Sequence, residues 1–189
     1  MSPLVILKAI ELQGKTFGMR FMRRLRMLHN VEGESAYSRP SLMRLAEALT
    51  EYGLDLDEFH RDVSSDTIQQ MLEKETELVT EWDVRILPTL AFVGDEEAIK
   101  AEGPYEYLVY VSILSELLDH TIEKQPKPPL EQFLRRYETA TTAEIAFIYD
   151  APESQIEHEL KKLVLQQKCA SLSYCDGKVW RHLKDSAHA

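Results

Sequence analysis

The ten residues from Val84 to Val93, VRILPTLAFV, constrain the fold more than any other stretch of the chain. They are apolar and rich in β-forming residues, and they follow a long polar segment with helical spacing. Pro88 lacks the N–H group that a central strand donates, so it belongs at the first residue of a strand, at an edge or at a bulge. A cis peptide bond costs far less before proline than before other residues, which makes Pro88 a cis-proline candidate. The alternative is an ordinary buried strand that begins with proline.

The composition indicates a globular protein. The chain has 189 residues, 44% of them hydrophobic and 29% charged, which suffices for one large domain or two small ones with a hydrophobic core. Its formal net charge is −10, so it repels phosphate groups overall. General nucleic-acid binding is therefore disfavoured unless a local basic face exists.

The cysteines are too few for a disulfide scaffold, because the chain holds only Cys169 and Cys175. On one strand, six residues at roughly 3.3 Å each would separate them by about 20 Å, beyond disulfide reach. We therefore expect two reduced thiols in a cytoplasmic protein. The N-terminus has a short apolar run with no charged segment before it, which predicts neither a signal peptide nor a membrane span.

The residues before the central stretch show helical spacing. The predicted helices cover residues 4–29 with a break at Gly14, residues 41–52, a short helix from Asp55 through Phe59, and residues 66–80. The helix after Gly14 carries a basic face, which is either a solvated surface or a docking patch for an acidic partner. This face consists of Lys15, Arg20, Arg23, Arg24 and Arg26.

The residues after the central stretch predict a hairpin and a closing helix. Residues 94–97 form a turn, residues 98–101 a second strand, and Gly103-Pro104 opens an apolar helix. Residues 123–129, EKQPKPP, are polar and proline-rich, and they form the best domain boundary in the chain.

The C-terminal part predicts a separate small unit. Its elements are helices at 130–137, 145–149 and 153–167, then strands at 172–174 and 179–181 that flank an Asp176-Gly177 turn. A capping box at residues 141–144 opens the second helix, and residues 150–153 cap the third. Three helices followed by a hairpin is the order of a winged helix. The third helix carries Glu153, Glu157 and Glu159 against Lys161 and Lys162, so its charge argues against contact with phosphate and favours a protein-contact or structural role.

The order and spacing of several short motifs resemble the DsbA-like branch of the thioredoxin superfamily. The likeness is strongest to the cytoplasmic adaptor proteins of Gram-positive bacteria that present the stress regulator Spx to the ClpXP protease. The motifs are KAIELQG at 8–14, GLDLDEF at 53–59, ILPTL at 86–90, GPYEY at 103–107, PLEQFL at 129–134, KKL at 161–163 and GKVWR at 177–181.

The resemblance implies an α/β, mostly helical fold class. Residues 1–122 would form a partial DsbA-like thioredoxin domain with a helical insert. Residues 123–129 would be the linker, and residues 130–185 a winged-helix-like domain.

The sequence departs from this family in its thiols. No cysteine precedes Cys169 and no strand-like run precedes the first helices, so the N-terminal βαβ segment with its CxxC motif is absent from this sequence. It is either removed, encoded on another chain, or lost. A dithiol reaction needs an activated thiolate and a resolving cysteine. Without that segment the strand at 87–93 would keep an open edge that association could fill.

Three functions remain as hypotheses. By resemblance, the chain is a non-enzymatic adaptor that binds Spx and promotes its degradation by ClpXP through tethering. The alternative is a DsbA/FrnE-like dithiol–disulfide oxidoreductase that needs the N-terminal segment, and the third is a DNA-binding regulator. The adaptor hypothesis names partner-binding residues around the proline: Trp82, Arg85, Ile86, Leu87, Pro88 and Thr89.

We expect no catalytic residue, metal site or cofactor. The six histidines are scattered without a defensible ligand spacing, and the sequence has no glycine-rich phosphate loop.

Overall fold

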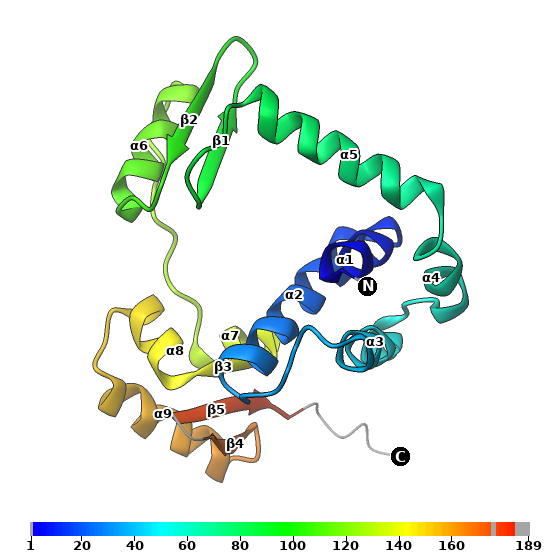
Figure 1. Cartoon of the computed structure of the whole chain (residues 1–189). Helices are drawn as coiled ribbons and strands as arrows, with labels where there is room; N and C mark the ends of the chain where they lie inside the picture. The colour runs from blue at the N-terminus through cyan, green and yellow to red at the C-terminus, as the bar shows by residue number, and fades with distance from the viewer. Residues whose placement is uncertain (1, 175–176, 184–189) are drawn as a thin grey trace. The chain divides into compact units, whose positions relative to one another are not determined.

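The computed structural model describes residues 2–174 and 177–183. The fold is mostly helical with small antiparallel sheets (Figure 1). The first elements are α1 (Pro3–Leu12), α2 (Lys15–Asn30), α3 (Arg39–Glu47), the 3-10 helix η1 (Ala48–Tyr52), α4 (Leu56–Asp62) and α5 (Asp66–Glu81). Then follow β1 (Thr89–Val93), β2 (Ala98–Glu102), α6 (Tyr107–Leu117), α7 (Leu130–Tyr137), β3 (Thr139–Thr141), α8 (Thr142–Tyr149), α9 (Glu153–Leu165), β4 (Cys169–Tyr174) and β5 (Gly177–His182).

Contacts divide the chain into two compact units. Unit 1 comprises Met1–Lys15 and Gly53–Gln125, and unit 2 comprises Thr16–Tyr52 and Pro126–Ala189. The break at Gln125 lies inside the predicted linker at 123–129. The segment Thr16–Tyr52, which the sequence analysis placed in the first domain, groups instead with the C-terminal part.

The arginines of α2 explain this grouping. Arg23 pairs with Glu144 at 2.9 Å, Arg20 pairs with Glu138, and Arg24 pairs with Glu32, all inside unit 2. The basic face of α2 is therefore neither a simple solvated surface nor an open acidic-partner patch at these three positions. It is largely neutralised by carboxylates of its own unit.

The helical part of unit 1 is built as the periodicity predicts. Helix α1 packs against α4 and α5, and its inward residues Ile6 and Ile10 are fully buried together with Phe59. The Asp55 carboxylate accepts from the Glu58 N–H at 2.9 Å and caps α4. Gly53 adopts φ +97, the left-handed conformation expected just after a helix.

The hairpin of unit 1 is shorter than predicted at its beginning. Strand β1 starts at Thr89, and residues 84–88 are irregular, because Pro88 has no N–H group for the ladder. Strands β1 and β2 pair antiparallel with Ala91 opposite Lys100. Tyr110 of α6 stacks on Phe92 of β1, so α6 covers one face of the hairpin.

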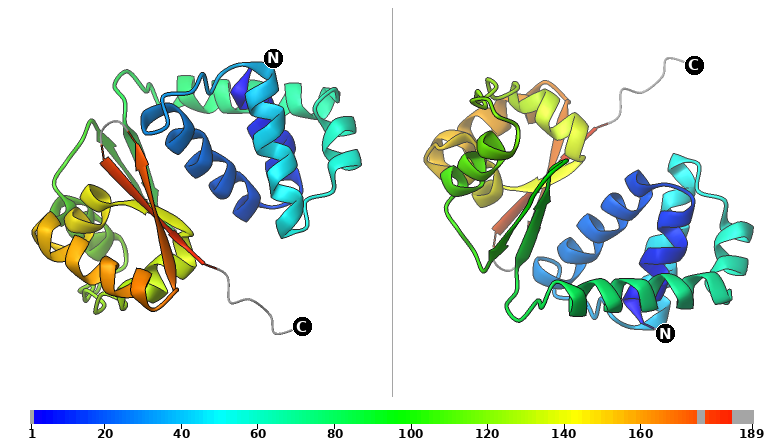
Figure 2. Two further views of the ribbon diagram at one scale, coloured as in Figure 1. Left: turned by 90° about the horizontal axis from the view of Figure 1, so that it is seen from below. Right: turned by 90° about the horizontal axis from the view of Figure 1, so that it is seen from above.

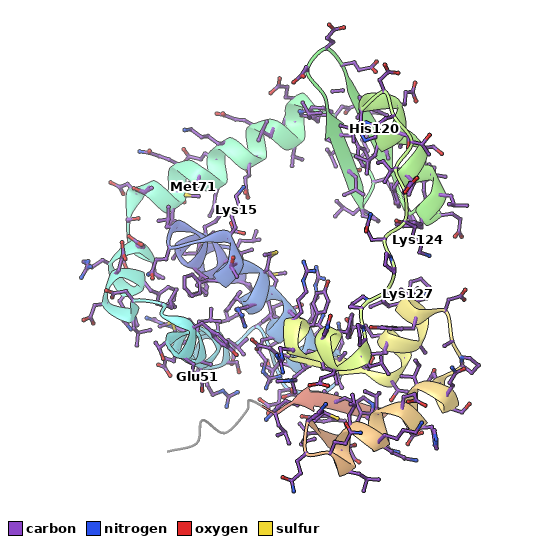
Figure 3. All side chains as sticks on the ribbon, turned by 180° about the vertical axis from the view of Figure 1, so that it is seen from behind. Lys15, Glu51, Met71, His120, Lys124 and Lys127 are labelled. Carbon is purple, nitrogen blue, oxygen red and sulfur yellow. The ribbon has the colours of Figure 1, made fainter. Side chains whose placement is uncertain are left out.

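Helix α6 also begins later than predicted. The sequence predicts a start at Gly103-Pro104, whereas the helix starts at Tyr107 with Glu106 in the capping position. Gly103 instead adopts φ +88 and ends the hairpin. The extended chain after α6 carries Lys124 and Lys127 (Figure 3).

The C-terminal part of unit 2 is a helical group on a small sheet. Among the described residues the strand order is β3-β5-β4, all antiparallel. Helices α7, α8 and α9 pack on these strands around a core that includes Phe133, Leu160 and Trp180 (Figure 2). The Trp180 indole N–H donates to the Thr142 hydroxyl at 2.9 Å.

Three local predictions for this unit have different outcomes. The Thr141 hydroxyl accepts from the Glu144 N–H at 3.1 Å, so the predicted cap of α8 is confirmed. The cap of α9, predicted within residues 150–153, is Pro152, and Asp150 ends α8 in the left-handed conformation. The predicted Asp176-Gly177 turn and Cys175 involve residues outside the described ones.

No helix in the described part of the chain is long and apolar enough to cross a membrane.

Candidate partner-binding site

The predicted site begins where α5 ends. The N–H of Trp82 donates to the Leu78 carbonyl at 2.9 Å, and the N–H of Val84 reaches back to the Val79 carbonyl at 3.0 Å. Asp83 adopts φ +47 between them. These contacts close the last turn of the helix and direct the chain toward the hairpin, with the Trp82 side chain half-buried at the corner.

Lys100 of β2 holds this corner against the hairpin. Its ammonium group donates to the Trp82 carbonyl at 2.9 Å and to the Asp83 carbonyl at 3.2 Å. A cation at the C-terminal end of a helix also interacts favourably with the helix dipole. Lys100 is therefore a positioning residue for the segment that follows. The sequence does not single it out, because a lysine within a predicted strand carries no signal of such a role.

The segment from Arg85 to Thr89 is held at its C-terminal end. The Pro88 carbonyl accepts from the Gly103 N–H at 2.8 Å, and the Thr89 hydroxyl donates to the Ile86 carbonyl. The Leu87–Pro88 peptide bond is cis, the isomer for which Pro88 was a candidate. The six predicted site residues thus run from the C-cap of α5, Trp82, to the first residue of β1, Thr89.

The apolar side chains of this segment lie open. Leu87 is 83% exposed and Ile86 is 52% exposed. Such large exposed apolar side chains in adjacent positions are more typical of an interaction surface than of a free protein surface.

The backbone of the segment is also open. Within the described residues, neither the N–H nor the C=O group of Arg85 or Leu87 has a hydrogen-bond partner. An extended peptide can satisfy such groups by adding main-chain hydrogen bonds alongside the segment. The geometry therefore suits recognition of a peptide chain by its backbone together with apolar side chains.

The charge beside the segment comes from one exposed ion pair. The Arg85 guanidinium contacts the Asp83 carboxylate side-on, with N–O distances of 2.9 and 2.8 Å. Both side chains are exposed, so the pair contributes little to stability and can exchange partners. Arg85 is therefore available to a carboxylate of a binding partner.

No activated thiol lies in the site. Cys169 is the one cysteine among the described residues, and it belongs to unit 2. Its Sγ lies 3.6 Å from the Leu160 carbonyl, and burial raises the pKa of its thiol. A thiol of this kind is a small core residue and a poor nucleophile.

A cluster of three or more metal-ligating side chains does not occur among residues 2–174 and 177–183.

The comparison with protein families settles the affiliation. The model of a family described as thioredoxin matches residues 2–112, more than half of the chain. The chain belongs to the thioredoxin family. The match covers the α1–α5 helices, the site segment, the hairpin and half of α6.

Several curated relatives of this thioredoxin-family chain share one name, ClpXP adapter protein SpxH. The relative from Halalkalibacterium halodurans is 36% identical over 186 residues, which cover 97% of this chain and 60% of the relative. The Bacillus subtilis relative is 34% identical, with 93% and 59% covered. The Staphylococcus saprophyticus relative is 34% identical, with 92% and 66% covered. The chain therefore spans about three fifths of the length of these relatives, and the resemblance seen in its motifs is confirmed.

The structure also reveals a surface that sequence reasoning did not find. A hollow of about 530 Å³ between α8 and α9 is lined by Ala146, Ala151 and Pro152, beside the Phe147 ring, which is 89% exposed. Asp150 and Glu153 contribute carboxylates to its lining. The sequence signal for it is the apolar run from Ile145 to Tyr149 in α8. The carboxylates make this surface unfavourable for a phosphate backbone.

Proposed function

We propose that this chain is a non-enzymatic adaptor of the cytoplasm that binds the transcriptional regulator Spx and promotes its degradation by ClpXP. The observation that carries the proposal is the similarity to relatives named ClpXP adapter protein SpxH, which match 92–97% of this chain at 34–36% identity. The open segment at Arg85–Thr89 supports it, because that segment suits protein recognition and holds no reacting group.

The mechanism that we propose is proximity. The exposed Ile86 and Leu87 side chains and the open backbone of Arg85 and Leu87 would hold an extended segment of the regulator. Trp82 would line one side and Arg85 would pair with an acidic residue. Binding raises the effective concentration of the regulator at the protease without forming or breaking a covalent bond.

We further propose that α7–β5 form a winged-helix-like unit that contacts proteins and not DNA. The element order α7-β3-α8-α9-β4-β5 and the antiparallel β3-β5-β4 sheet support this assignment. The first turn of α9 carries Glu153, and the turn before it carries Asp150, where a DNA-binding helix would need cations.

The dithiol oxidoreductase remains the alternative hypothesis, favoured only by the family to which the chain belongs. It predicts that an added N-terminal segment with a CxxC motif confers disulfide reduction within reach of Pro88. The adaptor proposal predicts binding in reducing buffer with no such addition.

The test is calorimetric binding of the purified chain to the cognate Spx protein in reducing buffer, with Leu87→Asp and Pro88→Ala variants. Leu165 on α9 is a matched control, because it is 85% exposed where Leu87 is 83% exposed. We expect Leu87→Asp to weaken binding by tenfold or more, Pro88→Ala to weaken it less, and Leu165→Asp to leave it unchanged. Tenfold corresponds to about 1.4 kcal/mol, the scale of one buried apolar contact.

Two results would contradict the proposal. The absence of binding by the unmodified chain would remove the adaptor role from this part of the protein. Equal weakening by Leu87→Asp and Leu165→Asp would remove the partner site from the Arg85–Thr89 segment.

A further inference from the structure

The apolar core of the C-terminal part does not include α2. This core gathers residues such as Leu160 and Trp180, and no residue of the segment Thr16–Tyr52 belongs to it. That segment, which carries α2, α3 and η1, buries apolar side chains of its own, and Phe21 and Leu42 among them are fully buried. The core of the C-terminal part therefore does not join it to α2, although both belong to unit 2.

Arg23 of α2 reaches across to the C-terminal part with all three guanidinium nitrogens. Its Nε–H donates to the Tyr137 carbonyl at 3.2 Å, and its two terminal nitrogens donate to the two oxygens of Glu144 at 2.9 and 3.2 Å. One of these nitrogens also donates to the Thr139 carbonyl. A bidentate pairing of arginine with a carboxylate is both strong and geometrically specific. Arg23 therefore connects α2 to the end of α7, to β3 and to the first turn of α8.

Arg20 makes a second connection three residues before Arg23 on α2. One oxygen of the Glu138 carboxylate accepts from Arg20, and the other accepts from the Tyr52 hydroxyl at 2.6 Å. The Arg20 guanidinium lies over the Tyr52 ring, 3.9 Å from its centroid, which is a favourable cation–π arrangement. Two side chains of the Thr16–Tyr52 segment thus hold one carboxylate of the C-terminal part.

The backbone of Glu138 has a conformation that favours glycine. Glu138 is the C-cap of α7 and has φ +66, which glycine adopts readily and residues with a Cβ adopt at a cost. A local preference of this kind is given up where the side chain serves a contact elsewhere in the fold. The contact of the Glu138 carboxylate with Arg20 and Tyr52 provides such a reason.

We propose that these contacts form a releasable latch between α2 and the C-terminal part, and that its release uncovers an arginine face on α2 for a partner segment rich in carboxylates. The four charged side chains are between 28% and 35% exposed, so water and salt weaken both ion pairs. The chain between α6 and α7, residues 118–129, has no helix or strand and can follow the movement. The latch consists of Arg20, Arg23, Tyr52, Glu138 and Glu144.

The latch is tested on the pure chain, so its test does not depend on the proposed function. Phenylglyoxal modifies accessible guanidinium groups, and peptide mass spectrometry gives the rate at each arginine. Glu138→Gln should raise the rate at Arg23 by roughly threefold or more, although Glu144, the carboxylate partner of Arg23, is unchanged. Glu144→Gln should likewise raise the rate at Arg20, because release of one pair releases the other.

Glu34→Gln is the matched control, because Glu34 pairs with Arg44 at 2.9 Å inside the Thr16–Tyr52 segment. It should leave the rates at Arg20 and Arg23 unchanged. Acceleration confined to the arginine whose own carboxylate was replaced would mean two separate ion pairs and would overturn the latch. Acceleration at Arg20 and Arg23 by Glu34→Gln would overturn it as well.

Glu138→Gly separates a latch from a contact that merely stabilises the core. Glycine relieves the cost of φ +66, so the denaturation midpoint followed by Trp180 fluorescence in a Trp82→Phe background should not fall. The same variant should make Arg20 and Arg23 react faster. A lower midpoint, or unchanged rates at both arginines, would contradict the proposal.

Binding of poly-L-glutamate tests the arginine face itself. The double variant Glu138→Gln/Glu144→Gln should bind this probe at least about tenfold more tightly than Glu73→Gln/Glu77→Gln. The second double variant loses the same two charges at exposed positions of α5, so it controls for net charge. Equal binding by the two double variants would show that release uncovers no site for carboxylates.

Discussion

The hydrogen bond between Trp180 and Thr142 provides the sharpest test of the C-terminal core. Trp180 is 1% exposed, and its indole N–H donates to the Thr142 hydroxyl at 2.9 Å. Thr142→Val keeps the shape and branching of the side chain and replaces the acceptor with a methyl group. The indole N–H is then buried without this acceptor, because Trp180 and Thr142 are both buried.

The expected loss follows from the cost of an unsatisfied buried donor, about 1–3 kcal/mol. We expect about 2 kcal/mol, which is roughly a thirtyfold change in the unfolding equilibrium. Thr142→Ser retains the hydroxyl and removes one methyl group, so it should cost only about 1 kcal/mol.

The measurement is equilibrium denaturation followed by tryptophan fluorescence in a Trp82→Phe background. Trp82 and Trp180 are the only tryptophans, and they lie in different compact units, so the remaining signal reports unit 2 alone. This matters because a chain with two units need not unfold in a single transition. Trp180→Phe leaves no tryptophan in this background, so the double-mutant cycle with Thr142→Val is followed by circular dichroism and isolates the coupling energy.

The reasoning is refuted if Thr142→Val costs no more than Thr142→Ser. It also fails if the double-mutant cycle shows no coupling energy, because the Thr142 hydroxyl would then not act as the hydrogen-bond acceptor of the Trp180 indole.

Three further predictions concern charged groups. Lys100→Met should destabilise unit 1 by about 1–2 kcal/mol, because the carbonyls of Trp82 and Asp83 lose a cationic donor. Lys124→Met is the control and should leave the free energy of unfolding unchanged. Equal denaturation curves for the two variants would contradict the prediction. The hydrogen bond from Lys178 lowers the pKa of Glu157, and Lys161 adds to the effect. The ion pair therefore stabilises the folded state above the ordinary carboxyl pKa, and this stabilisation is lost as the pH falls through the pKa of Glu157 in the folded state. Lys178→Met should raise the pKa of Glu157 in an NMR titration, and an unchanged value would refute the pairing. Burial, and after it the hydrogen bond to Glu138, raises the pKa of Tyr52 from 10.0 to about 12. The contribution of the Tyr52 phenol to stability is therefore complete below its ordinary pKa and is lost as the pH rises to about 12. Tyr52→Phe should reduce the loss of stability that denaturation measurements show across this pH range.

The helices and caps were predictable because their signals are local. The break at Gly14, the cap at Asp55, the cap at Thr141 and the span of α7 all appear as the sequence indicates. Each depends on residues within one or two turns of each other, so no distant contact is needed to decide them.

The later starts of α6 and β1 were not predicted correctly. At each place a nearby proline or glycine allows the helix or strand to begin at more than one residue. The choice was made by partners elsewhere in the fold, such as the Gly103 N–H that occupies the Pro88 carbonyl.

The sequence by itself determined the helical periodicity, the hairpin, the proline at the head of β1 and the family resemblance. It also placed the six proposed site residues close together in the chain, between positions 82 and 89. Only the tertiary structure decided that Thr16–Tyr52 groups with the C-terminal part and that Lys100 holds the corner before the site. Only the tertiary structure shows that the Leu87 side chain is exposed. The physical reason is that ion pairs, strand edges and exposure join residues far apart in sequence, and periodicity carries no information about them.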